Sequence, residues 1–83
     1  MSAAVFDQIR TMASDLFGVP EERITADSSP QTLEAWDSIQ HLNLVLALEE
    51  KFSVQLSPEE IEQITNIGET AKLIESKLQA TSR

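Results

Sequence analysis

The sequence predicts an all-α fold: a four-helix bundle with three long helices, a short third helix and a long loop between the first two helices. Three stretches carry apolar residues at spacings of three and four, which gather on one face of a helix. A fourth stretch opens with a helix-capping sequence. No segment of four or more residues alternates apolar and polar side chains well enough to predict a strand, so an all-α bundle follows.

The first helix is expected over residues 3–17. Gly18 follows its last apolar residue, where glycine commonly ends a helix, and Pro20 does not readily continue one. Residues 18–37 therefore form a long loop with a short helical turn at residues 20–23. The apolar face of the helix comprises Val5, Phe6, Ile9, Met12, Ala13, Leu16 and Phe17.

The long loop needs anchors of its own. A structureless connection of this length is unusual in a compact domain unless its apolar side chains pack down. The candidates for that packing are Val19, Ile24, Leu33 and Trp36.

The second helix is expected over residues 38–52. Asp37 is its predicted N-cap, and the negative charge of Asp37 suits the positive end of the helix dipole. Leu44 widens an already broad apolar face, so we expect burial on more than one side. The rest of that face comprises Ile39, Leu42, Val45, Leu46, Leu48 and Phe52.

The third helix is expected over residues 58–64. Ser57 is its cap, Pro58 suits its first turn, and Glu60 completes a capping box with the serine. The fourth helix is expected over residues 67–79, with Thr65 or Asn66 as its cap. Its predicted inner face comprises Ile67, Ala71, Ile74 and Leu78.

Length and composition limit the function. The 83 residues suffice for one domain, residues 1–83, without a second core. The net charge of −8 opposes binding to nucleic acid or to an anionic membrane, and favours protein partners with basic docking patches. Cysteine is absent, so disulfides and thiolate metal sites are excluded. No loop offers calcium ligands at alternating positions around a glycine, so no metal site is expected.

The sequence also predicts a cytoplasmic location. Its first ten residues lack the basic start and apolar run of an export signal. The longest apolar run, residues 44–48, is far shorter than the roughly 20 residues that span a bilayer. We expect a monomer that does not bind membranes.

The tripeptide Asp37-Ser38-Ile39 at the entrance to the second helix is the most informative motif. By position alone, Asp37 and Ser38 are capping residues. A nucleophilic Ser38 with His41 as base is disfavoured, because nothing orients the imidazole and no strand–turn–helix elbow surrounds the serine. In a third interpretation Ser38 carries a phosphate-linked group, because unpaired N–H groups at a helix N-terminus favour an anion.

The residues on both sides of this motif support the third interpretation. The pattern runs from the first helix to Leu78. Its parts are Asp37-Ser38-Ile39, Ala47-Leu48-Glu49-Glu50 in the second helix, Ser57-Pro58-Glu59-Glu60-Ile61, and Ile64-Thr65-Asn66-Ile67. In these residues the chain resembles the acyl carrier protein family.

The resemblance implies that a phosphopantetheinyl transferase joins 4′-phosphopantetheine from coenzyme A to Ser38, with Mg²⁺. The protein is then a phosphoprotein and a carrier, not an enzyme. Acyl groups are then bound to the arm as thioesters. Acyl-processing partner enzymes carry out the chemistry on them in fatty acid, polyketide or related specialised biosynthesis. The residues expected to serve transferase or partner recognition are Asp37, Ile39, Trp36, His41 and Glu49. Ile39 is expected to lie half in the core.

Carriers of fatty acid synthesis usually have acidic residues in the first turns of the second helix, and this chain has none there. Acidic residues return only at Glu49 and Glu50. Trp36 replaces a small or acidic residue, and it either pins the loop onto the bundle or offers partners a flat contact. These departures favour a discrete carrier in a specialised pathway. The side chains in those first turns are Gln40, His41 and Asn43.

An acyl cargo is expected to lie between the second and third helices, where aliphatic side chains exceed what one thin seam requires. Two alternatives remain open. The cargo is instead an aminoacyl, peptidyl or D-alanyl group on the same arm, or the chain is an acidic helical interaction module without a prosthetic group. The expected lining of the acyl site is Leu42, Leu46, Leu56 and Ile61.

Overall fold

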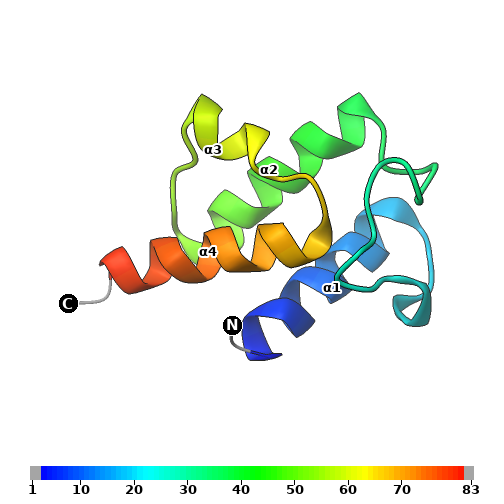
Figure 1. The fold of residues 1–83 in the computed structure, drawn as a ribbon, viewed down its shortest axis with the longest axis horizontal. Coiled ribbons are helices and arrows are strands. Elements are labelled where there is room, and N and C mark those ends of the chain that lie inside the picture. The colour runs from blue at the N-terminus through cyan, green and yellow to red at the C-terminus, as the bar shows by residue number, and fades with distance from the viewer. Residues whose placement is uncertain (1–2, 82–83) are drawn as a thin grey trace.

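The computed structural model describes residues 3–81, which form four α-helices and one 3₁₀ turn (Figure 1). The all-α prediction is confirmed, and the first two long helices have the predicted limits. The elements are α1 (Ala3–Phe17), η1 (Glu21–Arg23), α2 (Ser38–Phe52), α3 (Pro58–Glu62) and α4 (Ile67–Thr81).

Two helix ends differ from the prediction. The third helix stops at Glu62 and not at residue 64, because the Ile64 N–H donates to the Ile61 carbonyl three residues back, at 3.1 Å, and the four-residue ladder ends. Helix α4 continues two residues beyond residue 79, since no glycine or proline interrupts it and Ala80 favours a helix. Both differences concern the last residues of a helix, where the sequence pattern defines the boundary least clearly.

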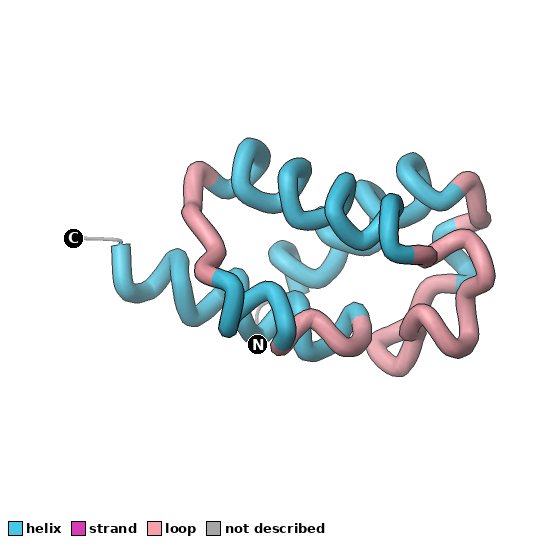
Figure 2. The backbone as a smooth tube through the Cα atoms, turned by 90° about the horizontal axis from the view of Figure 1, so that it is seen from above, coloured by secondary structure: helices cyan, strands magenta, loops and turns pink. Residues whose placement is uncertain are grey.

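The core forms where α1 packs against both α2 and α4. Helix α3 is a short crossover between α2 and α4, and the long loop gathers at the end of the bundle where α1 stops and α2 starts (Figures 1 and 2). None of the helices within residues 3–81 is both long and apolar enough to cross a bilayer. The least exposed core side chains are Ile9, Ala13, Leu44, Leu48, Ile67, Ala71 and Ile74.

The loop from residue 18 to residue 37 is packed down by its own apolar residues. Ile24, Leu33 and Trp36 are buried, and Val19 packs partly buried against the core. Burial of these side chains offsets the conformational entropy lost by ordering so long a connection. The predicted anchors of the loop are therefore confirmed.

The same loop also caps α4. The Ile67 N–H donates to the Ser28 carbonyl at 2.9 Å, and the Gly68 N–H donates to the Ala26 carbonyl at 2.9 Å. Asn66 is the N-cap, since its side-chain oxygen accepts from the Glu69 N–H at 2.7 Å. Three of the N–H groups that begin a helix without partners are thus satisfied, and the loop is fixed to the bundle.

The predicted capping box of α3 is present. The Ser57 hydroxyl accepts from the Glu60 N–H at 3.2 Å, and the Glu60 carboxylate accepts from the Ser57 N–H at 2.9 Å. Lys77 on α4 donates to both carboxylate oxygens of Glu60, at 2.9 and 3.0 Å. The Ser57 N–H first and the Lys77 ammonium second hold the pKa of Glu60 below its usual 4.5. One carboxylate therefore caps α3 and ties it to α4.

Candidate functional site

Ser38 is the first residue of α2, and its side chain is exposed. The preceding residue, Asp37, is the N-cap: its carboxylate accepts from the Gln40 N–H at 2.9 Å. The predicted cap is confirmed, and it is supplied by the aspartate alone. Capping therefore accounts for Asp37 but leaves Ser38 without a structural role.

The Ser38 hydroxyl is exposed. Within residues 3–81 it makes no hydrogen bond. The N–H groups of Ser38 and Ile39 also lack an acceptor in this part of the chain, whereas the His41 N–H already bonds the Asp37 carbonyl at 2.8 Å. A phosphate on this oxygen would meet two open donors and the positive end of the α2 dipole.

Trp36, two residues before Ser38, is buried to 2% exposure and holds the entrance of α2 in place. Its ring packs on Phe17 at the end of α1, with ring centroids 5.4 Å apart and planes at 28°. Its indole N–H donates to Nδ1 of His41 at 3.0 Å. Trp36 therefore pins the loop onto the bundle, which is one of the two roles considered from the sequence.

A second contact fixes the first turn of α2 to α1. The Gln40 side-chain amide donates to the Leu16 carbonyl at 2.9 Å, one of the carbonyls at the end of α1 without a helical partner. Asn43 in turn donates to the Gln40 side-chain oxygen at 3.0 Å. Nothing in the local sequence around Gln40 signals this role, because its partner is 24 residues earlier.

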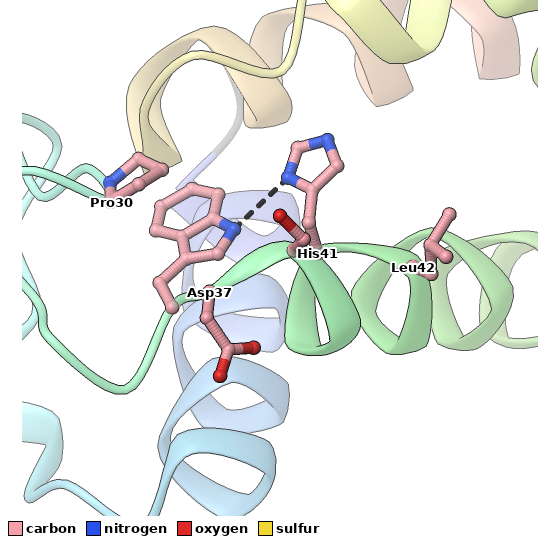
Figure 3. A pocket seen from close by; sticks show the side chains of 6 residues that line it. Pro30, Asp37, His41 and Leu42 are labelled. Carbon is pink, nitrogen blue, oxygen red and sulfur yellow. Dashed lines mark hydrogen bonds between the residues drawn. The ribbon is translucent and has the colours of Figure 1, made fainter.

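An open groove of about 570 Å³ lies beside Ser38 (Figure 3). It brings together the end of the long loop and the first turn of α2. Pro30 could not be chosen from the sequence, because it is eight residues from the serine and carries no periodic signal. The residues lining the groove are Pro30, Trp36, Asp37, Ser38, His41 and Leu42.

Comparison with known proteins identifies the family. The family model described as a phosphopantetheine attachment site matches residues 7–74. The chain belongs to this family of acyl carrier proteins. It is 29% identical over 76 residues to an acyl carrier protein of Guillardia theta, covering 92% of this chain and 94% of that protein. It is also similar to the solution structure of a holo acyl carrier protein from Geobacter metallireducens, with a TM-score of 0.82, 26% identity, and coverage of 92% and 87%.

Membership of the acyl carrier protein family makes the chain a carrier and not an enzyme, with a covalent 4′-phosphopantetheine as its cofactor. The residues at the start of α2 fit that group. An exposed hydroxyl without a partner, two open N–H donors and an adjacent groove lie together, as a phosphodiester and its arm require. Family membership, and not this geometry, excludes the alternative of an interaction module without a prosthetic group.

The acyl carrier fold does not place the predicted acyl-site residues in one enclosed space. Leu42 and Leu46 lie on the outer face of α2 and are 60% and 63% exposed. Leu56 is buried, and Ile61 packs partly buried against the core. Leu42 and Leu46 are not enclosed because the apolar surface of α2 is wider than the seam that α1 and α4 cover. An acyl site among these four residues stays a prediction.

Ile39 is also more exposed than the sequence predicted. It is 71% exposed and does not lie half in the core. Ile39, Leu42 and Leu46 are three and four residues apart, so they form one exposed apolar stripe along α2. A contiguous apolar stripe in water is typical of an interaction surface.

Glu49, which the sequence offered as a recognition residue, has a partner within the chain. Its carboxylate accepts from the Leu56 N–H at 2.9 Å and is half-buried. This contact closes the link from α2 to α3. A role for Glu49 in recognition stays a prediction.

His41 is half-buried at the rim of the groove, near the serine, as the sequence suggested. Its Nδ1 accepts from the Trp36 indole, so that nitrogen has no lone pair left with which to activate Ser38. Within residues 3–81, no three metal-binding side chains lie close enough together to hold an ion. The geometry agrees with a carrier and not with a serine hydrolase.

Proposed function

We propose that Ser38 is the attachment residue of the 4′-phosphopantetheine arm. The proposal rests on one observation at the start of α2. Asp37 caps the helix, so the exposed hydroxyl of the next residue, Ser38, is not needed as a cap and has no partner. When bound, the arm supplies the thiol on which acyl groups are held as thioesters.

In the modification step, the Ser38 oxygen forms a bond to the phosphorus next to the pantetheine of coenzyme A. The pyrophosphate bond breaks, and adenosine 3′,5′-bisphosphate leaves with the electron pair. The serine proton passes to a base of the transferase or to solvent. The open N–H groups of Ser38 and Ile39 support this assignment, because they favour the phosphodiester that results.

We further propose that the chain is a single-domain, monomeric carrier of the cytoplasm that serves a specialised acyl pathway, such as polyketide synthesis, more than general fatty acid synthesis. The first turns of α2 support this, since Gln40 bonds α1 and Asn43 bonds Gln40, and neither adds the acidic charge of fatty-acid carriers. Acyl-processing enzymes would contact the exposed stripe of Ile39, Leu42 and Leu46, with the net charge of −8 attracting basic patches around it.

Intact-mass measurement tests the attachment. The chain is incubated with coenzyme A, Mg²⁺ and a broad-range phosphopantetheinyl transferase, and a gain of about 340 Da is expected, the mass of the prosthetic group. Ser38→Ala should abolish the gain and keep the fold, because the cap bond from Asp37 is retained. Ser76→Ala, at an exposed serine of α4, is the matched control and should gain the full mass.

Loading of the modified protein tests the cargo. Acyltransferases and adenylating enzymes of the acyl class should form a thioester on the arm. Exclusive loading with an amino acid by an adenylating enzyme would overturn the acyl assignment while leaving Ser38 as the attachment residue.

A further inference from the structure

The hydrogen bond between Trp36 and His41 decides which nitrogen of the imidazole carries the proton. The indole N–H can only donate, so Nδ1 of His41 accepts and Nε2 keeps the hydrogen. The two ring planes are 19° apart and the centroids 6.0 Å apart, an arrangement that the 3.0 Å hydrogen bond accommodates. The ring of His41 is therefore a donor of known tautomer and orientation.

The partner that fixes this tautomer is itself buried. Trp36 is 2% exposed and packs on Phe17, so the indole has no room to turn. Nε2 of His41 lies on the side of the imidazole away from that hydrogen bond (Figure 3). The structure thus presents the Nε2–H donor of His41 at the rim of the groove that also contains Ser38.

The groove offers apolar surface as well as this donor. Leu42 is 60% exposed and lines the groove together with Pro30 and Trp36. Its neighbour on the stripe, Leu46, is 63% exposed and does not line the groove. An exposed leucine beside a donor suits a ligand that alternates apolar groups with amide carbonyls.

We infer that the groove holds the first part of the pantetheine arm, an inference that rests on attachment at Ser38. The two methyl groups nearest the phosphate contact Leu42 and Pro30, next to the buried Trp36, and an amide carbonyl of the arm accepts from Nε2–H of His41. Ser38 itself lines the groove, so an arm attached to it begins at the groove. The arm is then held against the loop side of α2, and the stripe beyond Leu42 stays open to partners.

Nuclear magnetic resonance of the holo protein tests this contact. The chain has one tryptophan and one histidine, so their ring signals are assigned without ambiguity. With the mass gain verified, we expect nuclear Overhauser effects from the arm methyl groups to Leu42 and Pro30, and a shift of the His41 Nε2 signal relative to the apo protein. A fully modified protein in which the arm methyl groups show none of these effects would overturn the inference and leave attachment at Ser38 standing.

A matched pair of variants separates the groove from the rest of the stripe. Leu42→Ala and Leu46→Ala remove the same exposed side chain from the same helix, and both should keep the fold. The methyl contacts of the arm should be lost or strongly weakened in Leu42→Ala and unchanged in Leu46→Ala. Equal loss in both variants, or in neither, would contradict a groove-bound arm.

Trp36→Phe tests the role of the tautomer. The phenyl ring keeps the packing on Phe17 but has no N–H to give to His41. We expect nitrogen-15 spectra to show both neutral tautomers of His41 and the shift on modification to fall, while the mass gain remains complete. Retention of the single Nε2–H tautomer with an unchanged shift would show that the indole does not set the donor.

Discussion

The backbone N–H of Gly68 donates to the carbonyl of Ala26 at 2.9 Å, which brings the long loop into direct contact with the first turn of α4. A Cβ atom on residue 68 would lie 3.0 Å from that carbonyl oxygen and 3.2 Å from the Ala26 Cβ. The close approach explains why glycine stands here in a helix, where it is otherwise unfavourable. It also links the loop that carries Trp36 to the helix farthest from the site in sequence.

Gly68→Ala should destabilise the fold by about 1 kcal/mol, since overpacking against fixed backbone outweighs the gain of about 1 kcal/mol in helix propensity. Chemical denaturation measures the loss, and amide signals of Ala26 and Ser28 should shift. Gly18→Ala is the contrast: nothing lies within 4 Å of its added Cβ, but the φ of +69° strains an alanine. That variant should lose stability and leave those two amide signals in place.

Acid should weaken the attachment of α3. The pKa of Glu60 is lowered in the folded protein, chiefly by the Ser57 N–H and then by Lys77, so this carboxylate stabilises the fold above its unfolded pKa of about 4.5. That stability is lost as the pH falls below 4.5 through the folded pKa. Glu60→Gln should remove this part of the acid dependence, measured by denaturation as a function of pH. Glu59→Gln, at an exposed neighbour, is the control and should leave it intact.

Two substitutions of Asp37 separate its cap from its charge. Asp37→Ala should cost about 1 kcal/mol, because the Gln40 N–H loses its acceptor. Asp37→Asn keeps a good cap and should be stable to within a few tenths of a kcal/mol. We expect the transferase to modify both variants more slowly than the unchanged chain, since both lack the carboxylate implied in recognition. An asparagine variant modified at the normal rate would limit Asp37 to capping.

Glu49→Ala should destabilise the fold by about 1–3 kcal/mol, because the buried Leu56 loses the acceptor of its N–H. Glu49→Gln keeps an acceptor oxygen and should cost less than half as much. Amide exchange at Leu56 reports the bond directly, and Glu50→Ala, at an exposed position, should stay within about 0.5 kcal/mol of the unchanged chain. If partner proteins also bind the Glu49 carboxylate, Glu49→Gln should weaken their binding without a matching loss of stability.

The helices and their caps could be predicted because their causes are local. The Ser57–Glu60 box joins residues three apart, and so does the bond that the Gln40 N–H donates to the Asp37 carboxylate. The apolar periodicity of α1 and α2 also lies within single segments. Ser38 stood out for the same reason, as a serine next to a cap at the head of an apolar helix.

The tertiary structure decided which apolar residues of α2 face inward. Leu44, Val45 and Leu48 are buried, whereas Ile39, Leu42 and Leu46 are exposed. No local pattern distinguishes these two sets, because the whole helix is apolar on more than one side. Which residues of α2 are buried is decided by α1 and α4, because these two helices cover only one face of α2.

The groove likewise depends on contacts between distant segments. Trp36 becomes an anchor because Phe17 lies under it, and His41 becomes a donor of one tautomer because the indole is held there. Pro30 joins the lining because the loop is bonded to the start of α4. The sequence shows where each side chain is attached to the backbone, but only the packing of distant segments decides which other residues that side chain contacts. The position of the proposed attachment serine was therefore readable from the sequence, and the groove beside it was not.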